Sequence, residues 1–290
     1  MATTTTKPRL VAVVGPTASG KSELAMRIAK EFNGEIVAAD SRTIYIGMDI
    51  GTAKPTEAER QEVRYWGLDL VQPGQNYSAH QFKKCAKEAI AEIQNRGKLP
   101  ILVGGTGLYV DAVLFDFGFG SKPDIHHRKE LEALSSDELQ EIIAEKGYEV
   151  PQNYQNRRHL IRTIERQGEE GTKKPIRPDV LAVGLQPKDE ELKERISVRA
   201  EKIFSYGVIE ETEELLRDYG EDAIQKTGGI IYKICLRLLK GEISRETARD
   251  LFKTADWQYA RRQRMWFKRN KNIKWFDTRQ KAYIFLTKYL

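Results

Sequence analysis

The stretch "VVGPTASGKSEL", residues 13–24, decides the fold of this chain because it joins an apolar strand to a helix through a glycine-rich turn. It contains the complete pattern G-x-x-x-x-G-K-[ST], in which backbone N–H groups and the helix dipole face a phosphate group. Lys21 supplies a positive charge there, and the Ser22 hydroxyl can reach a Mg²⁺ ion. We therefore expect a phosphate site with Mg²⁺ as cofactor, built from Gly15, Pro16, Thr17, Ala18, Ser19, Gly20, Lys21 and Ser22.

Strand and helix patterns alternate around this motif. Between the apolar runs, hydrophobic residues recur every three or four positions, which is typical of helices with one buried face. The runs typical of buried parallel strands lie at 10–14, 35–40, 67–71, 99–107 and 180–185. We predict an α/β fold, with a P-loop NTPase-like parallel sheet flanked by helices.

Residues 118–178 interrupt the alternation with short, charged helical patterns. We predict a helical insertion there, so that the core consists of residues 1–117 and 179–290. The second part of the core contains a long helix that becomes strongly basic towards its end, followed by a short strand in "IKWFD".

The charge distribution indicates a polyanionic partner. The formal net charge is +6, yet residues 253–290 alone hold eleven lysines and arginines against two acidic residues. No apolar run approaches the roughly 20 residues that span a bilayer. The two cysteines, Cys85 and Cys235, are too few for a disulfide framework. We expect a cytoplasmic protein without a membrane partner.

One acidic residue has two possible roles. P-loop enzymes that hydrolyse nucleotides hold Mg²⁺ with a second carboxylate at the end of a strand. Here the run at 99–103 ends in Gly104-Gly105-Thr106-Gly107, without an acid, whereas Asp40 closes the run at 35–40. From the residues alone, Asp40 could hold Mg²⁺ or face a substrate.

Four ordered motifs carry a resemblance to a known family. They are "GPTASGKS" (15–22), "ADSRTIYIGMDIGTAKP" (39–55), "LVGGTGLYV" (102–110) and "YARRQRMWF" (259–267). In order and spacing the chain resembles bacterial tRNA dimethylallyltransferases, also called tRNA isopentenyltransferases, from about residue 10 to 276. The resemblance implies transfer of a dimethylallyl group from dimethylallyl diphosphate to N6 of the adenosine 3′-adjacent to the anticodon in tRNA, with release of diphosphate.

The resemblance also implies roles for individual residues. Asp40 would be the general base, Lys21 would act on the diphosphate, Thr106 would position the acceptor, and Ser22 would bind the metal. Lys233 would face the diphosphate or the RNA. The expected partners are the tRNA anticodon stem-loop and dimethylallyl diphosphate, and we expect a monomer.

Contacts to tRNA are implied in the core, in the insertion and in the basic C-terminal helix. The residues concerned are Asp40, Ser41, Arg42, Thr43, Thr106, Arg128, Arg158, His159, Leu160, Ile161, Arg162, Lys233, Arg261, Arg262, Arg264 and Lys268. Without the resemblance, solvated charged faces are the simpler interpretation of the basic helices. In the C-terminal helix we expect Trp266 to pack inward and the arginines to face outward.

The chain departs from the family pattern at Thr43, where Gln is frequent, and at Ile231, where Gly is usual. It also has Asp256-Trp257 in place of Thr-Arg, which removes one cation. Two other functions remain open: a small-molecule kinase that uses the loop with ATP, and an RNA-binding module without catalysis.

Overall fold

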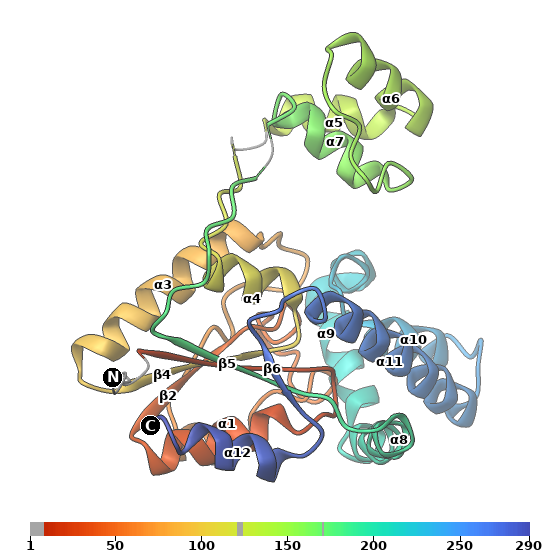
Figure 1. Ribbon diagram of the computed structural model, residues 1–290. Coiled ribbons are helices and arrows are strands. Elements are labelled where there is room, and N and C mark those ends of the chain that lie inside the picture. Colours follow the sequence, from red (N-terminus) through yellow and green to blue (C-terminus); the bar gives the residue numbers. More distant parts are fainter. Residues whose placement is uncertain (1–8, 121–123, 170) are drawn as a thin grey trace. The chain divides into compact units, whose positions relative to one another are not determined.

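The computed structural model describes residues 9–120, 124–169 and 171–290 (Figure 1). It divides into two compact units: a core formed by residues 1–114 and 176–290, and a smaller unit formed by residues 115–175. Residues 1–8 of the expected core lie outside the described residues. The smaller unit begins and ends three residues earlier than the insertion expected at 118–178.

The core is an α/β structure with a parallel sheet, as predicted. Its six strands lie in the order β3-β2-β4-β1-β5-β6, and every described pairing is parallel. The strands are β1 (Leu10–Val14), β2 (Gly34–Ala38), β3 (Tyr65–Trp66), β4 (Leu99–Gly104), β5 (Val180–Leu185) and β6 (Lys274–Phe276). Because β2, β4 and β1 are neighbours, the segments that follow them meet at the carboxyl edge of the sheet.

Helices cover both faces of this sheet (Figure 1). On one face, α1 (Lys21–Glu31) and α12 (Arg279–Leu286) pack their apolar sides onto β1, β2, β4 and β5. On the other face lie α3 (Ala79–Asn95) and α4 (Gly107–Leu114), which meet through the stacked rings of Phe82 and Tyr109. Ser78 caps α3 by accepting a hydrogen bond from the Gln81 N–H, as its position before the apolar pattern suggests.

The remaining helices of the core gather beside the sheet (Figure 1). The longest, α11, packs against both α8 and α10. Gly220 interrupts α9 with a positive φ of 76°, which kinks it. These helices are α8 (Asp189–Ser205), α9 (Val208–Lys226), α10 (Ile230–Leu239) and α11 (Arg245–Phe267). The short α2 (Glu57–Glu62) follows β2 and precedes β3 in the sequence.

The strand predicted at 67–71 is wrong. The third strand is Tyr65–Trp66, and the later segment makes a single bridge between Val71 and Tyr45. Gly67 and Asp69 both have positive φ, so the backbone turns there instead of extending. The turn directs the Asp69 carboxylate to Lys54.

The smaller unit consists of α5 (Ile125–Ala133), α6 (Ser136–Glu145) and α7 (Arg157–Glu165) around its own apolar core. That core contains the side chains of Leu160 and Ile161, which are 0% and 3% exposed. The expectation that these two residues contact tRNA is therefore corrected. Their side chains hold α7 in place and do not reach the surface. Arg158 and His159 of the same helix are exposed.

Two further arginines of this unit are held by a buried acid. Glu165, whose side chain is 1% exposed, binds Arg128 at 3.1 Å and Arg162 at 3.0 Å. Both guanidiniums stay partly exposed, so a phosphate group would have to share them with Glu165.

None of the helices in the described ranges combines the length and apolar character that a membrane span requires.

Candidate active site

The loop after β1 forms a cradle that opens into α1. Gly20 has a φ of +88° and turns the chain into the helix, whose first-turn amides, including those of Lys21 and Ser22, have no intrahelical partner. Ser19 Oγ is buried and lacks a hydrogen-bond partner among the described residues. A buried hydroxyl and free helix-start amides at one place are suited to bind an anion.

Lys21 contributes the positive charge of this cradle. Its Nζ donates to the carbonyl oxygen of Pro16 at 3.1 Å. Burial lowers the pKa of Lys21 to about 8; the charges of Asp40 and Asp256 act against this shift, and that of Arg199 adds to it. An anion in the cradle would favour the protonated form of Lys21 and so bind more tightly to it.

Asp40, Ser41 and Thr106 come together where β2 and β4 end. The Ser41 N–H donates to Thr106 Oγ1 at 2.9 Å, and the Thr106 N–H donates to the Ala39 carbonyl oxygen at 3.2 Å. Asp40 Oδ1 accepts the Arg42 N–H at 2.9 Å, which fixes the carboxylate beside its own backbone. Asp40 and Thr106 therefore lie at the same edge of the sheet.

Helix α11 supplies two site residues that the sequence analysis did not single out. Gln263 bridges the loop and the β4 turn, since its Oε1 accepts the Thr17 N–H at 2.8 Å and its Nε2 donates to the Gly105 carbonyl oxygen at 2.9 Å. The Arg42 guanidinium stacks on Tyr259 at 4.0 Å. Burial raises the pKa of the Tyr259 phenol, and the nearby Asp40 charge raises it further. The sequence signal for Gln263 is a polar residue within the apolar stripe of α11.

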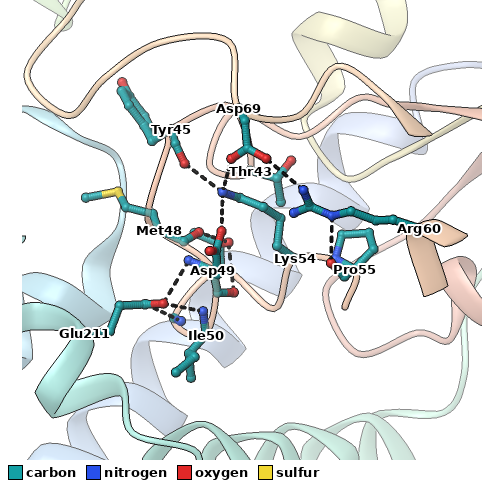
Figure 2. A network of polar contacts seen from close by, with 12 residues as sticks. Thr43, Tyr45, Met48, Asp49, Ile50, Lys54, Pro55, Arg60, Asp69 and Glu211 are labelled. Carbon is teal, nitrogen blue, oxygen red and sulfur yellow. Dashed lines mark hydrogen bonds and ion pairs between the residues drawn. The ribbon is translucent and has the colours of Figure 1, made fainter. Parts of the chain in front are cut away.

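Lys54 of the "GTAKP" segment is the centre of a buried polar network (Figure 2). Its fully buried ammonium binds the Tyr45 carbonyl oxygen at 2.7 Å and the carboxylates of Asp49 and Asp69 at 2.5 Å each. Asp69 also binds Arg60 at 2.9 Å. The network ties the chain before β3 to the chain after it, and so fixes the segment that carries Asp40 to Thr43.

Glu211 on α9 binds the chain between β2 and β3 at residues 49–51 (Figure 2). Its carboxylate accepts the N–H groups of Asp49, Ile50 and Gly51 at 2.7–3.0 Å, as well as the Tyr232 hydroxyl at 2.7 Å. Thr43, which stands where the family frequently has Gln, is buried, and its carbonyl oxygen accepts the Asp69 N–H at 3.3 Å. The sequence analysis quoted residues 39–55 as a family motif and named Thr43 as a tRNA contact, but it did not predict this network.

Ile231, where the family usually has Gly, lies against Gly51. A Cβ on Gly51 would lie 2.6 Å from the Tyr232 ring and 2.9 Å from the Ile231 side chain. Ile231 is buried in this contact. Lys233, two residues further along α10, is half-buried, and its expected contact with diphosphate or RNA stays a prediction.

The basic end of α11 differs from the expectation in two residues. Arg264 is 9% exposed and binds Asp189 and the Pro187 carbonyl oxygen, so it is not available on the surface. Trp266 meets the expectation of inward packing only in part: it is 37% exposed, but its ring lies against Gly107 at the start of α4 and its Nε1 donates to Asp111 at 2.9 Å. Arg261, Arg262 and Lys268 are exposed and could meet RNA.

The protein oxygens around the cradle can supply only part of the ligands that a Mg²⁺ ion requires. The described residues contain no group of three or more His, Cys, Asp or Glu side chains that could hold a metal. Mg²⁺ commonly takes one or two protein oxygens together with substrate phosphates and water. The exposed Ser22 hydroxyl and the Asp40 carboxylate are oxygens of this kind.

A family model described as IPP transferase matches residues 43–270. The chain belongs to this family. It is 36% identical to a tRNA dimethylallyltransferase of Staphylococcus epidermidis over 94% of this chain and 87% of that protein. It is 39% identical to one from a Thermoanaerobacter species over 92% and 91%. The family resemblance drawn from the sequence motifs is confirmed.

Solved structures agree with this assignment and with the predicted fold class. The full-length tRNA isopentenylpyrophosphate transferase of Bacillus halodurans superimposes with a TM-score of 0.72 at 34% identity, covering 98% of this chain and 97% of that one. A eukaryotic dimethylallyltransferase described as acting on tRNA gives 0.70 at 25% identity, covering 89% and 69%.

The lowered pKa of Lys21 makes anion binding depend on pH. Lys21 is protonated below its pKa of about 8, so we expect the affinity for inorganic diphosphate to fall above that pH, by up to about tenfold per pH unit. Calorimetric titration between pH 7 and 10 measures this. Lys21→Arg, which stays charged, should bind without the decline; an equal decline in this variant would assign the pH dependence to another group.

The Glu211 network should control the stability of the segment that carries Asp40. In Glu211→Gln, an amide group would have to face backbone N–H donors, so we expect a loss of about 1–3 kcal/mol in the free energy of unfolding. Urea unfolding at pH 7 measures it. Glu213→Gln, on the same helix and not part of this network, is the control. Equal free energies of unfolding of the two variants would contradict a stabilising role of the Glu211 hydrogen bonds.

Proposed function

We propose that the protein transfers a dimethylallyl group from dimethylallyl diphosphate to N6 of the adenosine 3′-adjacent to the anticodon in tRNA, releasing diphosphate. The observation that supports this most strongly is the grouping of the anion cradle with Asp40 and Thr106 at one sheet edge, in a member of the IPP transferase family. The relatives and solved structures named above act, by their descriptions, in this reaction class.

The loop is suited to hold the leaving group. In the transfer, the bond between C1 of the dimethylallyl group and the diphosphate oxygen breaks, and both of its electrons go to diphosphate. Preorganised N–H groups at the start of α1 and the Lys21 ammonium stabilise the negative charge that develops there. When bound, Mg²⁺ would add charge neutralisation on the phosphate oxygens, held by Ser22.

Asp40 is suited to accept the proton of the acceptor amine. A bond forms between C1 and N6 of adenosine, and N6 must then lose one proton, which the Asp40 carboxylate takes. The Ser41–Thr106 contact keeps this carboxylate and the Thr106 hydroxyl at the same place. The target base must leave its stack to reach them. The exposed Arg261, Arg262 and Lys268 would hold the RNA backbone.

Nucleoside mass spectrometry tests the proposal. Unmodified tRNA, Mg²⁺ and dimethylallyl diphosphate are incubated with the protein, and the RNA is digested and weighed. We expect one adenosine to gain a C5H8 unit. Transfer of phosphate from ATP without this gain would favour a kinase, and tight tRNA binding with unchanged RNA mass would favour a binding module.

Asp40→Asn separates the two roles that the sequence left open for this residue. Asn still accepts the Arg42 N–H but cannot take a proton, so we expect turnover to fall by about 10²–10⁴-fold with unchanged tRNA affinity. Single-turnover kinetics and filter binding measure both. Recovery of turnover at raised Mg²⁺ concentration would instead make Asp40 a metal ligand, and near-normal turnover would exclude both roles.

A further inference from the structure

Gln263 on α11 touches both halves of the candidate site. Its Oε1 accepts the N–H of Thr17 in the phosphate loop at 2.8 Å, and its Nε2 donates to the carbonyl oxygen of Gly105 at 2.9 Å. The side chain is 5% exposed, so water competes little for these two hydrogen bonds. Gly105 belongs to the turn of residues 104–107, which carries Thr106 and which we call the acceptor turn.

The two partners of Gln263 are of opposite kinds. The Thr17 N–H needs an acceptor, the Gly105 carbonyl oxygen needs a donor, and an amide side chain offers one of each on a single rigid plane. Space at this point is limited, since a Cβ on Gly105 would lie 2.2 Å from Gln263 Nε2 and 3.4 Å from the Gly15 carbonyl oxygen. The acceptor turn therefore lies against both the loop backbone and the Gln263 amide.

Two further residues of α11 contact the same two segments. Near the loop, Asp256 accepts a hydrogen bond from Thr17 Oγ1 at 3.5 Å. Near the acceptor turn, the ring of Trp266 lies against Gly107. Asp256, Gln263 and Trp266 are seven and three positions apart, so they share one face of the helix. A helix that binds two segments along one face can carry a change from the first to the second.

The acceptor turn is joined in turn to the residues beside Asp40. The Thr106 N–H donates to the Ala39 carbonyl oxygen at 3.2 Å, and Thr106 Oγ1 accepts the Ser41 N–H at 2.9 Å. A shift of Gly105 would therefore move Thr106 together with the two neighbours of Asp40 in the sequence.

We propose that Gln263 is a positioning residue that couples the phosphate loop to the acceptor turn, so that an anion bound in the loop orders the turn that carries Thr106. The inference rests on the proposed function, in which diphosphate and adenosine must meet in one geometry. Such coupling links the two binding events, because order imposed by the first ligand need not be imposed again by the second. If Gln263 only stabilised the packing of α11, diphosphate would affect the loop alone.

Hydrogen–deuterium exchange measured by mass spectrometry tests the coupling without requiring catalysis. We expect inorganic diphosphate with Mg²⁺ to slow amide exchange of the wild type in the loop, residues 15–22, and about five- to tenfold in the acceptor turn. Gln263→Leu removes both contacts of the amide, so diphosphate should still slow exchange in the loop but leave the turn unchanged. Gln258→Leu, at an exposed position of the same helix, is the matched control and should behave as the wild type does.

Gln263→Glu separates coupling from packing because it keeps the shape of the side chain. The ionised carboxylate would accept the Thr17 N–H but place an oxygen against the Gly105 carbonyl oxygen, whereas the protonated carboxyl group would donate to it. Burial favours the protonated form, so we expect the slowing in the turn to be lost at about pH 8 and to return at about pH 6, relative to the wild type at each pH. This variant decides the question if Gln263→Leu does not fold or does not bind diphosphate.

Three results would overturn the inference. They are a wild type in which diphosphate does not slow exchange in the turn, a folded Gln263→Leu that keeps the wild-type slowing there, and a Gln263→Glu that behaves alike at both pH values. A wild type that shows slowing in the turn but transfers no prenyl group would refute the proposed function and leave the coupling standing. Prenyl transfer by a wild type without slowing in the turn would do the reverse.

Discussion

Gly104 ends β4 against the carbonyl oxygen of Ala39, so closely that a Cβ would lie 2.0 Å from that oxygen. Because no side chain separates the two strand ends, the Thr106 N–H reaches the Ala39 carbonyl oxygen and Thr106 Oγ1 receives the Ser41 N–H. The rest of the site depends on this contact. Gln263 extends it from Gly105 to the phosphate loop, so that three strand ends form one surface.

Lys54 and Lys21 show how the same side chain serves two purposes. Lys54 has two carboxylates and a carbonyl oxygen as partners, and its charge is compensated within the protein. Lys21 has a carbonyl oxygen as its hydrogen-bond partner, and burial lowers its pKa to about 8. A lysine whose charge is incompletely compensated gains more from an incoming anion. The first therefore holds the segment with Asp40 in shape, and the second is suited to bind substrate.

Much of the fold could be predicted because the local patterns agree with it. The phosphate-loop pattern, the apolar runs of β1, β4 and β5, and the serine cap of α3 each correspond to one element. The strand predicted at 67–71 is wrong because the apolar pattern does not show that the Asp69 carboxylate binds Lys54. Gln263 and Arg264 could not be placed for a similar reason. These two polar side chains are buried because partners from other elements meet them, and the sequence does not show that Gly105 and Asp189 are these partners.

The central claim is that a dimethylallyl group is transferred with diphosphate as the leaving group, and an isotope label tests it directly. Dimethylallyl diphosphate that carries ¹⁸O in the oxygen between C1 and phosphorus is incubated with the protein and unmodified tRNA. The masses of both products are then measured. The account expects all of the label in the released diphosphate and an RNA that has gained only a C5H8 unit. Label or phosphorus in the RNA would contradict it.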